Sequence, residues 1–252
     1  MALSIPGLIL LSSIIYFNFL HQTPGTESFG PYFPYCSDPV DSKWIAKVNH
    51  IKWVAYSSPN PSTEPGFFQP SRETIRKDLL TLKKAGFTGL VTYGSIGVMG
   101  RDFPSIAQEL GFKGVIMGIW DPSNRSEFNN AMDASHLPVV LGFSIGNEGL
   151  YRSQGDRYTI PELCEAIMSL RAGTGKPVTT SEETDDFEDH PYLLHVGDWV
   201  FANAHPYWHA TKYAERAVKW EVKKIQGVDR ALESFCLFQG GWFAYLRRLR
   251  TL

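Results

Sequence analysis

The chain has 252 residues, which is enough for one α/β barrel or for two small domains. Hydrophobic residues make up 43% and charged residues 20% of the sequence, ordinary values for a globular protein with a buried core. The formal net charge of −2 argues against a broad electrostatic surface for nucleic acid, so no nucleic-acid partner is expected.

The three cysteines are Cys36, Cys164 and Cys236, and no two of them have CxxC spacing. An odd number of widely spaced cysteines argues against a dedicated disulfide framework. We therefore expect free and mostly buried thiols.

The first twenty residues carry no charged side chain, and no Lys or Arg occurs before Lys43. Such a run predicts either a signal peptide or a membrane anchor that barely crosses a bilayer, although the usual positive n-region is missing. We expect residues 1–22 to form this segment, with a helix at 5–20 outside the barrel core, and 23–49 to be a polar linker. With such a segment, the protein is expected to be secreted, displayed at the cell surface or anchored in a membrane. A cytosolic N-terminus is the alternative, and cleavage of the segment stays open.

From about residue 50, short apolar β-branched runs alternate with amphipathic stretches, a pattern that indicates buried strands separated by helices. The helix at 71–85 is the clearest, because Ser71 is a suitable N-cap and Ile75, Leu79 and Leu82 form an apolar stripe. The predicted strands are 51–56, 89–93, 114–120, 139–145, 177–180, 199–202 and 234–238. The other predicted helices are 103–110, 125–135, 160–171, a short one near 192–195, and 211–225.

Repeated β–α–β alternation with near-continuous apolar strands predicts a parallel sheet covered by helices. Six or seven such units fit a TIM-type (β/α)8 barrel over residues 50–252, one that is incomplete because an eighth unit is missing. No Gly-rich phosphate loop follows the first strand, which disfavours a doubly wound nucleotide-binding fold. An open flavodoxin-like sheet is the second choice.

Glu148 directly follows the fourth predicted strand, in the sequence Gly146-Asn147-Glu148-Gly149. Active sites of such barrels lie at the carboxyl ends of the strands. A partly desolvated glutamate there would have a raised pKa and could donate a proton to a leaving oxygen. Asn147 could hydrogen-bond a sugar hydroxyl. A glutamate that merely caps the following loop is the alternative.

Five strand-end sequences, WVAYSSPN, VTYGS, GNE, TTSEE and NAHPYW, occur in this order between about Lys52 and Lys224. Together they resemble glycoside hydrolase family 17, whose enzymes cleave β-1,3-glucan by a retaining mechanism. In that family the acid/base residue follows strand four and the nucleophile follows strand seven. The resemblance therefore implies a β/α barrel and a β-linked glucan as substrate, most plainly β-1,3-glucan.

Carried over by position, the resemblance makes Glu148 the acid/base residue and Asn147 its sugar-binding neighbour. It also implies cleft carboxylates at Glu182 and Glu183, of which Glu183 has the alternative of a solvated acidic loop. His205 and His209 have no third ligand at a supporting spacing, so neither a metal nor another cofactor is expected. The residues expected to bind substrate are Tyr56, Tyr93, Trp120, Asn147, Glu182, His205 and Tyr207.

The family pattern fails at the seventh strand, where a nucleophilic Glu would follow in a Leu-Phe-Lys-Glu-x-Gly sequence. Here residues 236–242 read CLFQGGW, and the last carboxylate, Glu233, precedes the predicted strand. We therefore expect the nucleophile to be missing, through truncation or a frameshift. Three hypotheses follow: an active retaining β-glucan hydrolase or transglycosylase, an inactive carbohydrate-binding remnant, and a membrane-attached scaffold.

Overall fold

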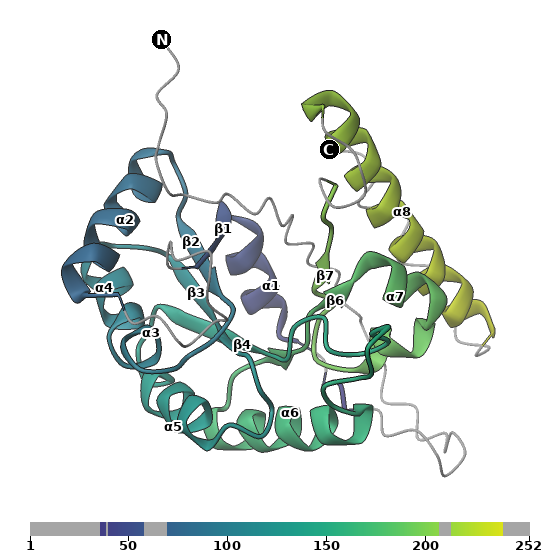
Figure 1. Ribbon diagram of the computed structural model, residues 1–252, viewed down its shortest axis with the longest axis horizontal. Helices are drawn as coiled ribbons and strands as arrows, with labels where there is room; N and C mark the ends of the chain where they lie inside the picture. The colour runs from purple at the N-terminus through teal and green to yellow at the C-terminus, as the bar shows by residue number, and fades with distance from the viewer. Residues whose placement is uncertain (1–35, 39, 58–69, 207–212, 239–252) are drawn as a thin grey trace.

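The computed structural model describes residues 36–38, 40–57, 70–206 and 213–238. Five parallel strands form one sheet in the order β1-β2-β3-β4-β5, and β6 pairs in parallel with β7 in a second sheet (Figure 1). The strands are β1 Trp53–Tyr56, β2 Gly89–Thr92, β3 Gly114–Ile119, β4 Val140–Ile145, β5 Val178–Thr179, β6 Glu182–Glu183 and β7 Ala202–Asn203.

Strand order in the main sheet follows chain order, and a crossover containing at least one helix joins each pair of neighbouring strands, as in a β/α barrel. Within the described residues the strands do not close into a full barrel, so the expected incomplete α/β barrel is confirmed. The helices are α1 Ser42–Asn49, α2 Arg72–Lys84, α3 Val98–Arg101, α4 Phe103–Glu109, α5 Arg125–Ala134, α6 Ile160–Thr174, α7 Thr184–Asp189, the 3-10 helix η1 Pro191–His195, and α8 Ala214–Phe238.

The outer face of the sheet packs against α2 to α6, which lie around it in Figure 1. The predicted apolar stripe of α2 is confirmed, because Ile75, Leu79 and Leu82 are all buried. Ser71 caps this helix as predicted, its hydroxyl accepting a hydrogen bond of 3.1 Å from the backbone N–H of Thr74.

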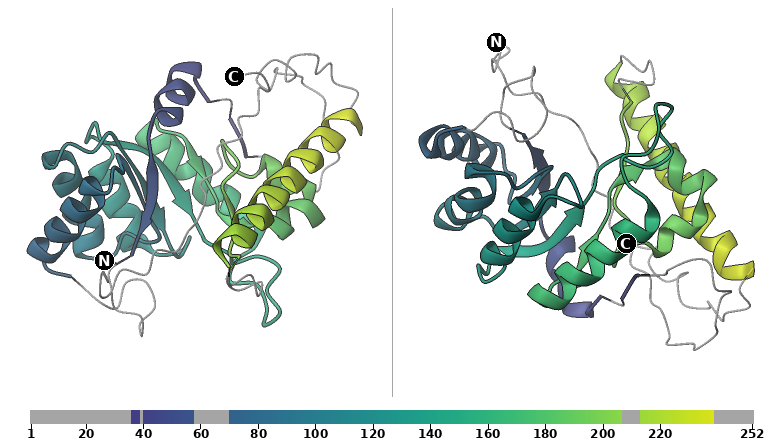
Figure 2. Two further views of the ribbon diagram at one scale, coloured as in Figure 1. Left: turned by 90° about the horizontal axis from the view of Figure 1, so that it is seen from above. Right: turned by 60° about the horizontal axis from the view of Figure 1, so that its bottom comes forward.

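Alternate strand residues point to the opposite, inner face, where a smaller core forms from Val91, Ile116, Leu141 and Trp199 among others. Helix α1 covers this core at the end of the sheet from which β1 starts (Figure 2). The indole Nε1 of Trp44 in α1 donates to the carbonyl oxygen of Leu141 at 2.7 Å. The opposite ends of the strands are thereby left for the functional site.

Residues 42–49 were expected to belong to a linker, but they form α1 and contribute Val48 to the inner core. The expectation of free thiols is wrong for two cysteines, since Cys36 and Cys164 form a disulfide. Chain folding brings these two residues together across a separation of 128 positions, which spacing rules for local cysteine motifs cannot reveal.

The predicted strand at 234–238 is also wrong, because this segment is the last part of α8. A short run of mostly apolar residues fits either a strand or part of a helix, and here the preceding helix continues through it. The predicted strand at 199–202 overlaps β7 only at Ala202.

Several predictions fall outside the described residues: the signal or anchor at 1–22, Tyr207, His209 and the chain after Phe238. In the part of the chain that the structure describes, no helix combines the length and the apolar character needed to cross a bilayer.

Candidate active site

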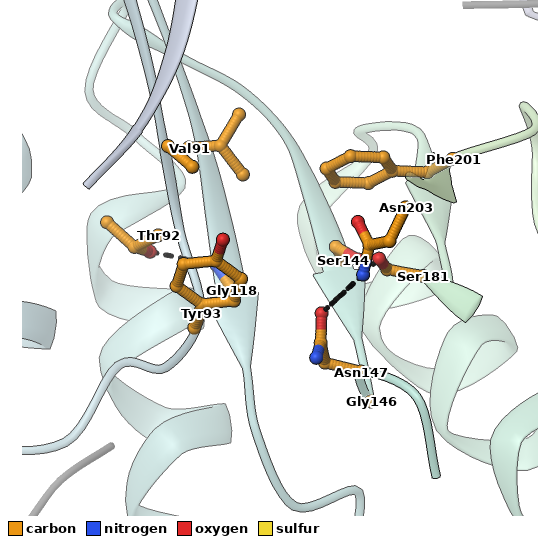
Figure 3. Close-up of a pocket in the computed structure, with 11 residues that line it drawn as sticks. Val91, Thr92, Tyr93, Gly118, Ser144, Gly146, Asn147, Ser181, Phe201 and Asn203 are labelled. Atoms are coloured by element: carbon orange, nitrogen blue, oxygen red, sulfur yellow. Dashed lines mark hydrogen bonds between the residues drawn. The ribbon is translucent and has the colours of Figure 1, made fainter. Parts of the chain in front are cut away.

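The carboxyl ends of the central strands surround a small pocket that is partly open to solvent (Figure 3). Tyr93 follows β2, Asn147 follows β4, and Asn203 ends β7, and all three line the pocket. Gly118 in β3 and Ser144 in β4 contribute to the wall between them. The parallel sheet thus brings residues from distant parts of the chain to one edge, as the barrel hypothesis requires.

Glu148 stands beside this pocket in a backbone conformation that is uncommon for a residue with a side chain. Its φ is +49°, and Gly146, two residues before it, also has a positive φ of +76°. The backbone N–H of Glu148 donates to the carbonyl oxygen of Ser181 at 2.8 Å, which ties the turn after β4 to the chain after β5. Left-handed conformations outside glycine cluster at functional sites where the surrounding structure enforces them.

The Glu148 carboxylate is held by two side chains from the segment around β7. His205 Nε2 lies 2.6 Å from Glu148 Oε1, and Asn203 Nδ2 donates to the same oxygen at 2.7 Å. Asn203 Nδ2 also donates to Asn147 Oδ1 at 3.0 Å, as the dashed line in Figure 3 shows. With 28% of its side chain exposed, Glu148 is restrained yet remains accessible to a ligand.

These contacts set the charge of the pair. Burial raises the pKa of Glu148, but hydrogen bonds from His205 and Asn203 and the charge of Arg157 outweigh it, so the net shift is downward. The hydrogen bond to Glu148 is the main cause of the raised pKa of His205. A raised pKa of Glu148 was expected from the sequence, and that expectation is wrong because it omitted His205.

Arg157 links the pocket residue Asn147 to Trp120, which was predicted to bind substrate. Its guanidinium lies 4.3 Å from the centroid of the Trp120 ring, a cation–π contact, and it hydrogen-bonds the carbonyl oxygen of Asn147. Arg157 therefore partly occupies one face of Trp120, a residue that was expected to bind substrate.

Glu182 was expected to be a cleft carboxylate, but its side chain is fully buried, with 0% exposed. Tyr158 OH donates to Glu182 Oε1 at 3.0 Å, and the backbone N–H of Leu150 donates to Oε2 at 3.3 Å. Burial is the main cause that raises the pKa of Glu182 to about 8. Both hydrogen bonds come from the loop that follows Glu148, so Glu182 stabilises that loop from the protein interior.

Tyr56 was also expected to bind substrate, but it is 2% exposed and faces the outer helices. Its hydroxyl donates to Asp78 Oδ2 at 3.0 Å, and its ring stacks on Phe103 with centroids 5.3 Å apart. It is the last residue of β1, and strand alternation turns it toward α2 rather than into the pocket.

The structure therefore brings together Glu148, Asn147 and His205, with Tyr93 across the pocket, whereas the side chains of Glu182 and Tyr56 are buried and do not line the pocket. Sequence reasoning missed Asn203 and Arg157 as site residues. Asn203 lay in a quoted motif two positions before His205, so the alternation of strand residues was the available signal. The described residues contain no group of three or more His, Cys, Asp or Glu that could hold a metal ion.

A parallel β/α sheet that restrains a glutamate with an imidazole and an amide after its fourth strand defines a glycoside hydrolase-like domain. The chain belongs to the family of the BtgE/BtgC glycoside hydrolase domain, whose profile matches residues 54–239. The sequence resemblance to glycoside hydrolase family 17 is confirmed at this level.

Among solved structures, the chain is similar to a glycoside hydrolase family 17 β-1,3-glucanosyltransferase from Rhizomucor miehei, with a TM-score of 0.55 and 22% identity. An active-site mutant of the Rhizomucor miehei β-1,3-glucanosyltransferase, in complex with laminaritriose, has a TM-score of 0.53 and 20% identity. Each match covers 72% of this chain and 66% of the other chain, just under two thirds of that enzyme. At sequence identities this low, the similarity shows only that the fold is shared. No curated protein sequence matches the chain.

Proposed function

We propose that this chain binds β-1,3-glucan at the strand-end pocket and that Glu148 is the acid/base residue of a retaining mechanism. The observation that carries the proposal is the restrained contact of Glu148 with His205 and Asn203 beside the pocket. The laminaritriose complex of the similar Rhizomucor miehei enzyme supports a β-1,3-glucan oligosaccharide as the ligand class.

The proton needed for acid catalysis starts on His205 in this proposal. A carboxylate only accepts hydrogen bonds, so His205 Nε2 carries the hydrogen between the two groups. That proton passes to Glu148, which protonates the glycosidic oxygen as the leaving group departs. General acid help of this kind accelerates a reaction by about 10²–10⁴-fold.

The described residues support only this half of a double displacement. A retaining enzyme needs a second carboxylate about 5–5.5 Å from the first to attack the anomeric carbon. No pocket-lining residue in the described part of the chain is a carboxylate, and Glu182 is engaged with Tyr158 and Leu150. We therefore expect glucan binding with no more than trace hydrolysis by this chain.

Calorimetric titration with laminaritriose, combined with a reducing-sugar assay on β-1,3-glucan, tests the proposal. We expect the chain to bind laminaritriose and Tyr93→Ala to bind it more weakly, because Tyr93 lines the pocket. Tyr213→Ala is the matched control, since Tyr213 is 68% exposed and absent from the pocket lining. Absence of any β-1,3-glucan binding would refute the proposal. Robust turnover that Glu182→Gln abolishes would show instead that Glu182 is the nucleophile.

We also propose that the chain is exported from the cytosol. The disulfide between Cys36 and Cys164 supports this, because such bonds persist in oxidising compartments. Peptide mapping without reductant on protein from the native source should recover the two cysteines linked, in the extracellular or cell-surface fraction. Recovery in the cytosolic fraction with both thiols free would contradict export.

A further inference from the structure

The turn that carries Glu148 is flanked by two glycines that pack directly against the side chain of Tyr158. A Cβ added at Gly146 would lie 2.5 Å from the Tyr158 hydroxyl oxygen, and one added at Gly149 would lie 2.1 Å from its ring carbon Cζ. Both distances are too short for a real Cβ, so only glycine lets the turn approach the ring this closely. Since Tyr158 is only 6% exposed, its ring forms a buried support for the turn.

The hydroxyl of Tyr158 is itself fixed by Glu182. Tyr158 donates to Glu182 Oε1 at 3.0 Å, and Glu182 Oε2 accepts from the backbone N–H of Leu150 at 3.3 Å. Glu182 therefore contacts both ends of the loop that runs from Leu150 to Tyr158. A carboxyl group and a phenol share one hydrogen bond whichever of them supplies the hydrogen, so this link persists when Glu182 is protonated.

Glu182 also has a fixed relation to the segment that carries His205. It is the first residue of β6, and in the parallel pairing of β6 with β7 it lies opposite Ala202. His205 follows Ala202 closely in the chain. The hydrogen bond between Tyr158 and Glu182 therefore joins the turn of Glu148 to the strand pair that leads to His205.

We propose that Tyr158, oriented by Glu182, is a positioning residue that holds the Glu148 carboxylate within hydrogen-bond distance of His205. The φ of Glu148, +49°, is unfavourable for a residue with a side chain, so the turn depends on its surroundings to keep this conformation. The contact of Glu148 with His205, at 2.6 Å, would be lost if the turn moved away by about 1 Å. This inference rests on the proposed acid/base role of Glu148, because only then does the orientation of its carboxylate affect catalysis.

An NMR titration of the His205 ring nitrogens in the full chain tests this role without requiring turnover. The hydrogen bond to Glu148 is the main cause of the raised pKa of His205, so this pKa reports whether the pair stays in place. In Tyr158→Phe, which keeps the ring and removes the hydroxyl, the pKa of His205 should fall toward its ordinary value of 6.5. The His205→Gln variant identifies the signal. An unchanged His205 pKa in folded Tyr158→Phe overturns the proposal.

Tyr56→Phe is the matched control. Tyr56 is also buried, and its hydroxyl also donates to a carboxylate, that of Asp78, at 3.0 Å. This pair lies on the outer face of the sheet, so its loss should lower stability without changing the pKa of His205. An equal fall of that pKa in Tyr56→Phe and Tyr158→Phe would mean that any lost buried hydrogen bond loosens the site, and it would overturn the positioning role.

Two variants at Glu182 separate the effect of the hydrogen bonds from that of filling space. Glu182→Gln keeps an acceptor for Leu150 and a donor for the Tyr158 hydroxyl, so it should preserve the raised pKa of His205. Glu182→Leu fills similar space without either bond and should lower this pKa, as Tyr158→Phe does. Equal His205 pKa values in the two Glu182 variants contradict the proposal.

If the variants do not fold, amide hydrogen exchange in the unmodified chain decides. The backbone N–H groups of Glu148 and Leu150 should exchange about as slowly as that of Phe143 in β4, because all three donate to acceptors within the fold. Fast exchange at Glu148 and Leu150 overturns the proposal. Laminaritriose titration is a separate readout: if the wild type does not bind while the NMR results are as expected, the proposed function fails and the positioning of Glu148 by Tyr158 stands.

Discussion

At the scale of single residues, the chemistry of the site depends on partners that are far apart in sequence. The sequence located Glu148 correctly beside the pocket, because a polar residue after a buried strand points to the active end of a barrel. It did not reveal the direction of its pKa shift, since His205 lies 57 positions away. It also could not show which of the adjacent carboxylates Glu182 and Glu183 turns inward, because a two-residue strand gives no pattern of alternation to read.

Glu182 leads to a prediction about stability and pH. Its pKa in the folded chain is about 8 against 4.5 for an unperturbed glutamate, so the folded state holds the proton across that window. The free energy of unfolding should then fall as pH rises from about 4.5 to 8, by up to about 1.4 kcal/mol per pH unit. Glu182→Gln, which resembles the protonated form, should remove this loss.

Urea denaturation of the wild type and of Glu182→Gln at about pH 5, 6.5 and 8 checks this effect, because these values sample the range between the unfolded and the folded pKa of Glu182. The stability of the variant relative to the wild type should increase at each step. Glu73→Gln in the first turn of α2 is the control, since Glu73 is exposed. A constant difference between Glu182→Gln and the wild type across the three pH values would contradict the burial argument.

At the scale of secondary-structure elements, most strands and helices were predictable from local signals. Strands showed runs of β-branched apolar residues, and helices showed an N-cap residue and a stripe of apolar side chains. The bounds of β2, β3 and β4 differ from prediction by one residue at one end. The last element was not predictable in this way. Residues 234–238 have strand-like composition, yet they extend α8, because helix continuation depends on the whole segment from Ala214 and on packing against α7.

A glycine in β3 gives a second prediction, about how closely the strands approach. A Cβ added at Gly118 would lie 2.1 Å from the carbonyl oxygen of Thr92 and 2.5 Å from the backbone carbon of Tyr93. Backbone atoms of β2 cannot yield as a side chain can, so Gly118→Ala should destabilise the fold by about 1–3 kcal/mol. It should also displace Tyr93 and weaken laminaritriose binding.

The matched control is Gly173→Ala in α6, where the new Cβ would meet only the flexible end of Met132. Alanine favours a helix interior by about 0.5–1 kcal/mol over glycine, so this variant should be neutral or slightly stabilised. Thermal denaturation of both variants provides the measurement. Equal melting temperatures for the two would show that β2 and β3 can separate without cost.

At the scale of the whole molecule, the sheet has a closed end and an open end. Helix α1 and the inner core cover the amino ends of the strands, and the carboxyl ends are left for the pocket. The segment before α1 is held by Arg171 of α6, whose Nη1 lies 3.0 Å from Asp38 Oδ2 and whose Nε donates to Asp198 Oδ2 at 3.0 Å. This attachment and the nearby disulfide were invisible to sequence reasoning, since they join residues more than one hundred positions apart.

The disulfide gives the last prediction. It closes a loop spanning 128 positions between Cys36 and Cys164, so its loss should enlarge the conformational freedom of the unfolded chain. Cys164→Ser should lower stability by about 2–4 kcal/mol, or roughly 4–16 °C in melting temperature for a chain of this size. Cys36→Ser and the double variant should show the same loss, because breaking either end removes one bond. Laminaritriose binding should persist in the variants that stay folded, since neither cysteine lines the strand-end pocket. Two single variants whose losses add in the double variant would mean that the cysteines stabilise the fold separately, as buried thiols, and that the bond itself contributes little.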